Sequence, residues 1–349
     1  MQKENLHTFI PIIVIVVSLI AFIFLIIAQN ETLGQTTTLS PSISYSFVKQ
    51  WGSKGSDIDQ FFYPIGIAVD SSGNVYVSDN GNNQIQMFDG NGNFLTKWDF
   101  NSPNYGHIVQ PGGIAVDSSG NVYVSDNGNN QIQKFDGNGN FLARWGTNGT
   151  DNGQFIGPEG IAVDSSGNVY VSDNGNNRIQ KFDGNGNFLA KWGTNGTANG
   201  QFIGPEGIAV DSSGNVYVTN YNSNTIIKFD GNGNFLTKWK TNNPEDIAVD
   251  SFGNVYVTNY IGVLKFDGNG TSITKWGSYG TGDGQFVGSG GVAIGPSGNV
   301  YVTDGENNRI EVFAPLILNP LSSDSSGKNG TASTDNNNPL SRSGISDQI

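Results

Sequence analysis

One stretch of sequence, residues 161–192, recurs along most of the chain, either whole or shortened. It reads IAVDSSGNVYVSDNGNNRIQKFDGNGNFLAKW and contains four short apolar runs, each followed by a cluster of Asp, Asn and Gly. Short runs rich in Val, Ile, Tyr and Phe that are separated by such clusters are typical of β-strands joined by tight turns. Each copy therefore predicts a four-stranded antiparallel meander.

A meander of this size cannot bury its own two faces, so it needs neighbours of the same kind. The sequence supplies six copies. The residues that end the first strand are spaced by 47, 47, 47, 39 and 45 positions, a period that suits four strands and their loops. These residues are Asp70, Asp117, Asp164, Asp211, Asp250 and, at the sixth place, Gly295.

The six tryptophans, one for each repeat, indicate how the array closes. Trp51 precedes the first repeat, whereas no Trp follows the last third strand, residues 310–313. Pairing the orphan strand at residues 47–51 with the incomplete sixth unit would leave no open edge between the chain ends. We therefore predict an all-β fold over residues 45–314: a six-bladed β-propeller of four-stranded antiparallel blades, closed by its N-terminal strand.

The repeat resembles a known family. The successive patterns P-x-G-I-A-V-D, G-N-V-Y-V-S-D, N-N-R-I-Q-K-F and G-x-F-L-x-K-W-G are similar to those of the NHL repeat. The resemblance covers all six units and implies a propeller. For function it implies several classes, because NHL propellers include peptide-amidating lyases, RNA- and protein-binding domains of ubiquitin ligases, and sensor domains of bacterial kinases.

The ends of the chain have a different composition. Residues 9–28 are uncharged and strongly apolar, about the length that crosses a bilayer as a helix. We expect a retained membrane anchor there, with residues 1–8 in the cytoplasm and the propeller on the extracytoplasmic side; a cleaved signal peptide, which would give a secreted protein, is the alternative. Residues 29–44 are expected to form a flexible stalk and residues 315–349 a disordered tail.

Composition narrows the chemistry. The chain has no Cys, so it forms no disulfide and has no thiolate site. Its formal net charge is −13. A protein that binds nucleic acid is expected to carry the opposite charge on at least one face, so we predict no nucleic-acid partner.

Carboxylates precede three successive first strands. If the first strand of each blade lines the axis, the residues just before it surround one mouth of the central channel. Glu159, Glu206, Glu245 and Asp246 hold these places in blades three to five. They are candidates for binding a cation, Ca²⁺ especially, or a basic ligand. The alternative is that they are solvated loop carboxylates.

Blade five breaks the repeat. The loop of residues 240–244 that leads into it is eight residues shorter than its neighbours. It is expected to leave a notch on the mouth face, flanked by Tyr221, Glu245, Asp246 and Tyr260, where a ligand without sixfold symmetry could bind. A neutral deletion is the alternative.

Other acidic residues are interpreted as turn formers. An Asp that opens an Asp-Ser-Ser-Gly-Asn turn usually accepts hydrogen bonds from the backbone two residues on. The same interpretation covers Asp79, Asp126, Asp173 and Asp304. The segment from Asp183 imitates the start of an EF-hand loop, but Phe188 replaces the required Gly and Thr194 the terminal Glu.

Sequence support for catalysis is weak. The resemblance implies that lyase relatives use a His-ligated metal, but this chain has only His7 and the loop residue His107. One His cannot build a His-rich zinc site, and no Gly-x-Ser-x-Gly elbow is present. We therefore predict no catalytic residue, no cofactor and no enzyme activity.

The sequence also contains Asn-x-Ser/Thr sequons, which in an exported loop are candidate glycan sites. They lie at Asn30, Asn148, Asn195, Asn269 and Asn329. Together these features predict a membrane-tethered extracytoplasmic propeller that binds or senses a protein, peptide or glycan. The alternatives are a metal-dependent lyase or hydrolase acting at the carboxylate-lined mouth, and a structural component of the cell surface.

Overall fold

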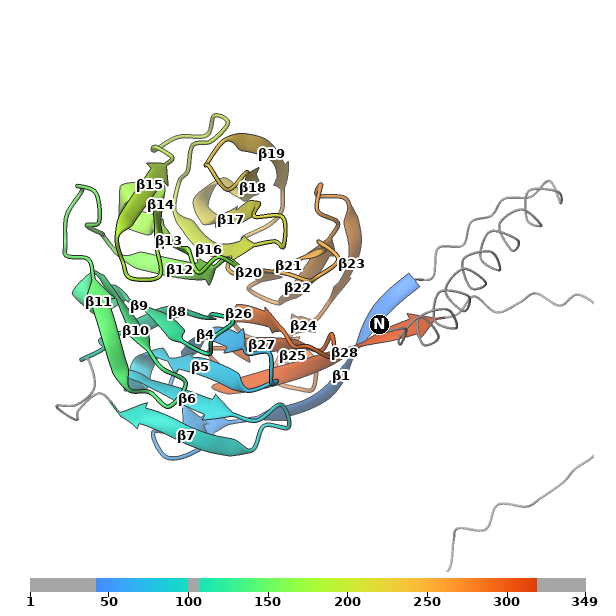
Figure 1. Ribbon diagram of the computed structural model, residues 1–349. Coiled ribbons are helices and arrows are strands. Elements are labelled where there is room, and N and C mark those ends of the chain that lie inside the picture. Colours follow the sequence, from blue (N-terminus) through green and yellow to red (C-terminus); the bar gives the residue numbers. More distant parts are fainter. Residues whose placement is uncertain (1–41, 100–106, 319–349) are drawn as a thin grey trace, which may run out of the picture. The chain divides into compact units, whose positions relative to one another are not determined.

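The computed structural model describes residues 42–99 and 107–318, which form six four-stranded antiparallel sheets arranged in a ring (Figure 1). The first strand of every blade contacts the first strands of both neighbouring blades, and the last contacts the first, so the ring is closed. The six-bladed β-propeller predicted from the repeats is confirmed.

Each sheet is one blade. Blade one has β4 (Pro64–Val69), β5 (Val75–Asp79), β6 (Gln84–Phe88) and β7 (Phe94–Asp99). Blade two has β8 (Pro111–Val116), β9 (Val122–Asp126), β10 (Gln131–Phe135) and β11 (Phe141–Trp145). Blade three has β12 (Pro158–Val163), β13 (Val169–Asp173), β14 (Arg178–Phe182) and β15 (Phe188–Trp192). Blade four has β16 (Pro205–Val210), β17 (Val216–Asn220), β18 (Thr225–Phe229) and β19 (Phe235–Lys240).

Blade five has β20 (Ile247–Val249), β21 (Val255–Asn259), β22 (Gly262–Phe266) and β23 (Ser272–Trp276). Blade six has β26 (Ser289–Ile294), β27 (Val300–Asp304), β28 (Arg309–Leu318) and β1 (Ser42–Trp51). The loops leading into blades one and six contain short parallel pairs, β2 (Ser53–Lys54) with β3 (Gln60–Phe61) and β24 (Ser278–Tyr279) with β25 (Gln285–Phe286). Single 3-10 turns follow the second strands of blades one to four: η1 (Asn80–Asn82), η2 (Asn127–Asn129), η3 (Asn174–Asn176) and η4 (Tyr221–Ser223).

The N-terminal strand closes the ring, as predicted. β1 pairs antiparallel with β28 along its whole length, from Ser42 opposite Leu318 to Trp51 opposite Ile310. The predicted limits of 45 and 314 were too narrow, because residues 42–44 and 315–318 were assigned to the stalk and the tail. These residues extend the two strands because each end of the chain supplies the hydrogen-bonding partner of the other.

The core lies between blades and is built from the repeat's aromatic residues. Each Trp of an outer strand packs on a Phe of the next blade, for example Trp51 on Phe88 at 5.6 Å and Trp276 on Phe313 at 5.9 Å between ring centroids. Buried Val and Ile residues of the first and second strands complete each layer. One Trp per repeat is therefore explained by packing between blades.

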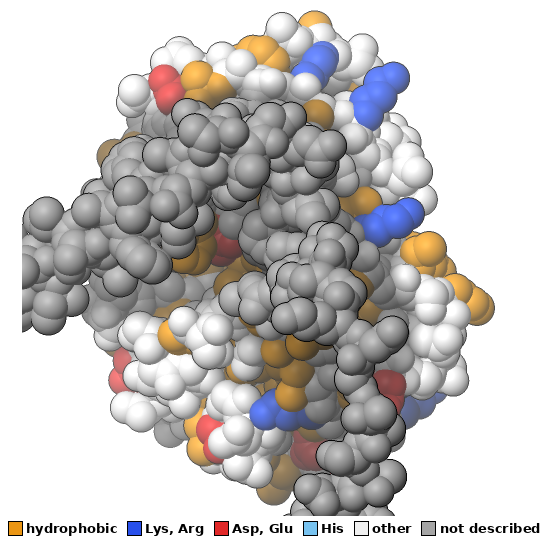
Figure 2. Space-filling model, turned by 90° about the vertical axis from the view of Figure 1, so that its right-hand side faces the viewer, with side chains coloured by type: hydrophobic (Ala, Val, Ile, Leu, Met, Phe, Trp, Pro, Cys, Tyr) orange, Lys and Arg blue, Asp and Glu red, His pale blue; other side chains and the backbone are white. Residues whose placement is uncertain are grey.

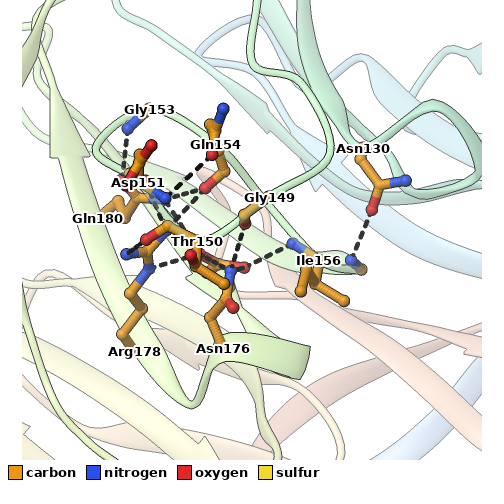
Figure 3. Close-up of polar contacts among 12 residues, drawn as sticks. Asn130, Gly149, Thr150, Asp151, Gly153, Gln154, Ile156, Asn176, Arg178 and Gln180 are labelled. Carbon is orange, nitrogen blue, oxygen red and sulfur yellow. Dashed lines mark hydrogen bonds and ion pairs between the residues drawn. The ribbon is translucent and has the colours of Figure 1, made fainter.

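In five of the six blades, the loop that leads into the blade is fixed by the Asp or Asn at the end of its second strand. We call this loop the lead-in loop. In blade three, Asp173 accepts hydrogen bonds from the Ile156 amide at 2.9 Å and from Arg178 Nε at 2.6 Å. The Arg178 guanidinium also donates to three carbonyl groups of the loop (Figure 3), those of Thr150, Asp151 and Gln154.

This finding corrects the interpretation of Asp79, Asp126, Asp173 and Asp304 as local turn formers. All four side chains are fully buried and bind residues distant in sequence. The Asp residues that end the first strands do form the expected turns: Asp164 accepts hydrogen bonds from the amides of Ser166 and Asn168, each at 2.9 Å. The EF-hand imitation at Asp183 is likewise a turn, with Asn185 and Asn187 donating to it.

Within residues 42–99 and 107–318, no helix is long and apolar enough to span a membrane. The expected cytoplasmic segment (1–8), the anchor or signal peptide (9–28), the stalk up to residue 41 and the tail from residue 319 lie outside the described residues. Asn30 and Asn329 lie there too. Of the other sequons, Asn148, Asn195 and Asn269 are exposed.

Candidate functional site

The four predicted carboxylates come together at one end of the central channel. Glu159 and Glu206 are the second residues of β12 and β16, and Glu245 and Asp246 directly precede β20. With residues of the other first strands they line a cavity of about 280 Å³ on the axis. In the other three blades Ile65, Gly112 and Gly290 stand at the place of Glu159, so the acidic side chains occupy one arc of the ring.

Asp246 occupies a place at which every other blade has glycine. That glycine is needed because neighbouring first strands approach closely: a Cβ on Gly160 would lie within 3.0 Å of the backbone of blade four. Blade five accommodates a side chain because its first strand begins later, at Ile247. The Asp246 carboxylate then reaches blade six, where it accepts a hydrogen bond from the Val292 amide at 3.0 Å.

Burial raises the pKa of all four carboxyl groups, and repulsion by neighbouring carboxylates adds to the effect at Glu206 and Glu245. Burial raises the pKa of Glu159 to about 7, partly offset by a 2.7 Å hydrogen bond from Asn127 Nδ2. Burial, followed by the charges of Glu159, Glu245 and Asp246, raises the pKa of Glu206 to about 8. Burial raises the pKa of Glu245 to about 7 and that of Asp246 to about 6. Near neutral pH the cluster therefore retains protons that a bound cation would displace.

One tyrosine lies near these carboxylates. Tyr63 is 46% exposed; burial, followed by the charges of Glu245, Glu306 and Tyr221, raises its pKa. Tyr260 is 41% exposed and donates a hydrogen bond to Glu306 at 3.2 Å. None of Tyr63, Tyr221 and Tyr260 lines the axial cavity. Aromatic rings attract ammonium and guanidinium groups through their faces.

Tyr63 was missed by sequence reasoning. It has a left-handed backbone (φ 58°), and its amide donates to Asn308 Oδ1 at 2.9 Å. A comparison of the repeats could have found it, because blade one alone has an aromatic residue at this position of the lead-in loop. The other five residues there are Gln110, Gly157, Gly204, Asn243 and Gly288.

The short lead-in loop of blade five does leave a hollow, but none of the predicted flanking residues lines it. Its walls are Lys240 to Asn242 and parts of β21, β22 and β23. Glu245 and Asp246 line the axial cavity instead, because the chain turns inward after Pro244. The hollow has a volume of about 560 Å³. Hollows of about 400 and 500 Å³ lie at the equivalent places of blades four and two, and the blade-five hollow differs from these two in reaching a third-strand phenylalanine, Phe266.

No group of three or more His, Cys, Asp or Glu side chains in residues 42–99 and 107–318 is placed to hold a metal ion. The proposed Ca²⁺ site at the mouth thus has no preformed ligand set in this part of the chain. His107, the single described histidine, is exposed in the lead-in loop of blade two. The axial carboxylates remain the described groups best suited to bind a cation.

Lysine and arginine side chains are scattered on the face shown in Figure 2 and form no continuous patch there. That distribution agrees with the negative net charge of the chain.

Comparison with known proteins supports the fold. Five segments match the NHL repeat: residues 61–88, 109–135, 155–182, 202–229 and 290–313. Blade five, with its short lead-in loop, is the blade without a match. A search of curated proteins finds no match.

Solved structures with the same architecture have diverse roles. A streptogramin B lyase is 16% identical with a TM-score of 0.55, covering 78% of this chain and 98% of its own. A gluconolactonase from Xanthomonas campestris is 12% identical with a TM-score of 0.57, covering 80% and 99%. A nidogen/laminin complex gives 17% identity and a TM-score of 0.53, covering 69% and 88%. Identities this low establish the fold and leave the function to the site.

Proposed function

Since the chain is a six-bladed β-propeller that carries NHL repeats, we propose that it is a binding module whose channel mouth recognises a cationic group. The proposal rests on four carboxyl groups that converge on one axial cavity. A cavity of about 280 Å³ has room for the amine or guanidinium group of one side chain. The expected ligand is therefore a peptide or protein segment that inserts a Lys or Arg.

Tyr63 supports the same ligand class. It lies within electrostatic range of Glu245, so an ammonium group bound at Glu245 would also be attracted by its ring. That ammonium group would lie close to Glu206 and Glu245, which line the same cavity. Its charge would favour the ionised form of both carboxylates, whose pKa values are raised in the free protein. Desolvated charge pairs of this kind contribute more to specificity than to affinity.

We further propose that residues 9–28 anchor the protein in a membrane and present the propeller on the extracytoplasmic side. The support is the length and apolarity of that segment. In this arrangement the module would bind or sense ligands outside the cell.

The test is calorimetric titration of the full-length protein in a nonionic detergent with trilysine and with its fully N-acetylated form. Trilysine should bind and the acetylated peptide should not. Glu206→Gln and Glu159→Gln should each weaken binding about tenfold, as expected for loss of a charge-assisted contact. Asp183→Asn, which removes one charge from an exposed turn, should leave affinity unchanged. Equal binding by all three variants would overturn the proposal.

A second candidate function is hydrolysis or elimination at the same mouth. It is favoured by the raised pKa of Glu159 and Glu245, both about 7, because a group that titrates near neutrality can both accept and donate a proton. Turnover of small lactones or esters that is abolished in Glu159→Gln would establish it. If the protein binds trilysine but does not turn over these substrates, the mouth would be assigned to ligand binding and not to catalysis.

A further inference from the structure

The hollow in blade five reaches the place where four other blades bury an aromatic side chain of the lead-in loop. In four other blades the lead-in loop inserts a phenylalanine beneath the blade, and each ring is fully buried. In blade three, Phe155 packs on Phe182 with ring centroids 5.7 Å apart. Arg178 and Asn176 hold the backbone of the loop around it (Figure 3). The four phenylalanines are Phe61, Phe155, Phe202 and Phe286.

Hydrogen bonds identify Thr241 as the equivalent residue of blade five. In blade three, the amide two residues after Phe155, that of Gly157, donates to Asn130 Oδ1 at 2.9 Å. In blade five, the amide two residues after Thr241, that of Asn243, donates to Asn224 Oδ1 at 2.7 Å. A threonine thus stands where the repeat has a phenylalanine, and Phe266, the counterpart of the Phe182 ring on which Phe155 packs, lines the hollow.

A second deletion lies beside the hollow. The turn between β21 and β22 has only two residues, Tyr260 and Ile261, and lacks the 3-10 turn of blades one to four. In blade three that turn supplies Asn176, which binds the lead-in loop at Gly149. Blade five therefore lacks both the part of the lead-in loop that corresponds to Gly149 and the side chain that corresponds to Asn176.

The chemistry of the hollow is that of a binding site. Its apolar lining includes Val263, Leu264 and Phe266. Thr241 also lines it, and its buried Oγ1 atom has no hydrogen-bond partner among the described residues. A buried hydroxyl without a partner is costly, which favours a ligand that supplies one. Asn259, whose counterparts Asp173 and Asn220 bind lead-in loop amides in their own blades, also faces the hollow.

Two lysines give the rim a positive charge. Lys240 and Lys275 line the hollow and are exposed, and their ammonium groups make no ion pair or hydrogen bond within residues 42–99 and 107–318. In a protein of net charge −13 such a pair of unpaired cations favours an acidic partner.

We propose that this hollow is a docking site for a phenylalanine or tyrosine side chain of an acidic segment of a partner protein. The ring would occupy the hollow, a backbone amide of the segment would donate to Asn259, and a neighbouring Asp or Glu would face Lys240 and Lys275. The site is separate from the axial cavity, with which it shares no lining residue.

The chain itself provides the probe. Residues 281–288, TGDGQFVG, fill the equivalent place in blade six through Phe286 and include Asp283. A capped peptide of this sequence with 4-fluorophenylalanine in place of Phe286 is titrated with the full-length protein in detergent and followed by ¹⁹F NMR. The resonance should shift and broaden. An unlabelled Phe peptide should displace it about tenfold to a hundredfold better than its Ala analogue, as expected for burial of one ring.

Variants of the protein decide the location. Thr241→Phe should fill the hollow, abolish binding and leave the melting temperature equal or higher. Ile108→Phe makes the matching change in blade two and should leave binding unchanged. If Thr241→Phe does not fold, the pair Lys240→Glu and Lys275→Glu provides the second test and should weaken binding of the acidic peptide at low salt.

Three outcomes would overturn the proposal. One is absence of binding by the wild type, and another is equal binding by wild type and a folded Thr241→Phe variant. The third is self-association of the wild type in sedimentation that Thr241→Phe abolishes, which would assign the hollow to a second copy of the chain.

Discussion

At the scale of single residues, buried acids at places where the repeat has a neutral side chain are the main departures from the repeat pattern. Glu311 occupies the place of Gln86, Gln133 and Gln180 and is fully buried. Gln180 Nε2 donates to Asp173 at 3.0 Å, which an ionised glutamate cannot do. Instead Arg309 faces two carboxylates, with Nη2 2.8 Å from Glu311 and Nε 2.8 Å from Asp304.

Replacement of Glu311 by Gln is expected to stabilise the propeller at alkaline pH. Burial raises the pKa of Glu311 to about 7, above its ordinary value of 4.5, although Arg309 partly offsets this. The folded state therefore binds the proton more tightly than the unfolded state. The contribution of Glu311 to stability is complete below pH 4.5 and is lost as the pH rises through about 7. Thermal unfolding at pH 5 and pH 8 should show a gain for Glu311→Gln at pH 8 only.

The reverse change serves as its control. Gln180→Glu places a carboxylate in the same environment of blade three and should create a loss of stability at pH 8 that is absent at pH 5. A Glu311→Gln variant equally stabilised at both values would show that packing, and not the charge, is responsible.

The axial carboxylates should couple ligand binding to pH. Their pKa values of about 6 to 8 mean that protons must leave before a cation is fully bound. Affinity for trilysine should therefore rise between pH 6 and pH 8.5. Calorimetry in two buffers of different ionisation enthalpy should detect proton release at pH 7, and the release should be smaller in Glu206→Gln. Affinity that does not vary over this range would contradict the assignment of the cluster.

At the scale of elements, the lead-in loop and the second-strand Asp form one unit. The Asp173 carboxylate and the Arg178 guanidinium are both buried and bind each other as well as the loop. Blades one and two achieve the same with Gln84 and Gln131, which donate to Asp79 and Asp126. We call this contact between the second-strand Asp and its third-strand partner the loop clamp. The fold therefore tolerates a loop clamp in which a neutral Gln replaces the Arg.

This comparison predicts unequal costs for two substitutions. Arg178→Gln copies blades one and two and should cost about 1 kcal/mol of the free energy of unfolding. Asp173→Ala leaves a buried guanidinium without its partner and should cost about 3–5 kcal/mol. Denaturant unfolding measures both, and exposed Arg144→Gln is the neutral control. Equal costs would show that the ion pair does not organise the loop.

The strands could be predicted from the sequence, but the loop clamp formed by Asp173 and Arg178 could not. Strand identity follows from alternating Val, Ile, Tyr and Phe between turn clusters, which are local signals. The carboxylate arc at Glu159, Glu206 and Glu245 also followed from the repeats, because equivalent places in a ring share one mouth. The role of Asp173 depends on contacts with residues 156 and 178, and those depend on the path of a loop. Tyr63 and the hollow at Thr241 could have been found only by aligning the lead-in loops, whose lengths differ.

At the scale of the whole molecule, the ring is closed by the pairing of β1 with β28, which we call the seam. Among the described blades, blade six alone contains strands from both ends of the propeller. In the other blades, the turn between the third and fourth strands lies against the Trp of the preceding blade. Blade six has no such turn, because its third and fourth strands come from opposite ends of the propeller. Tyr45 replaces this turn by stacking on Trp276 at 4.1 Å, and Lys265 donates to the Tyr45 hydroxyl at 3.1 Å.

A covalent link across the seam should stabilise the protein strongly. Ser44 and Leu316 are opposite each other in the β1–β28 pair, and the chain has no other Cys that could mispair. In the chain-entropy description, a disulfide between Ser44→Cys and Leu316→Cys would close a loop of nearly the whole propeller and contribute about 5–6 kcal/mol. The oxidised variant should melt well above its reduced form. Equal melting temperatures would indicate that the seam stays closed during the rate-limiting step of unfolding.

The seam also determines how the molecule responds to force. Ser42 and Leu318 are partners at the same end of an antiparallel ladder. A pull that separates residues 42 and 318 therefore loads the hydrogen bonds one after another, starting from that pair, and does not shear them together. The ring should open by unzipping at low force, and blade six should peel away while the other five blades are still folded. A propeller tethered at one end and held by a partner at the other would thus yield first at its closure.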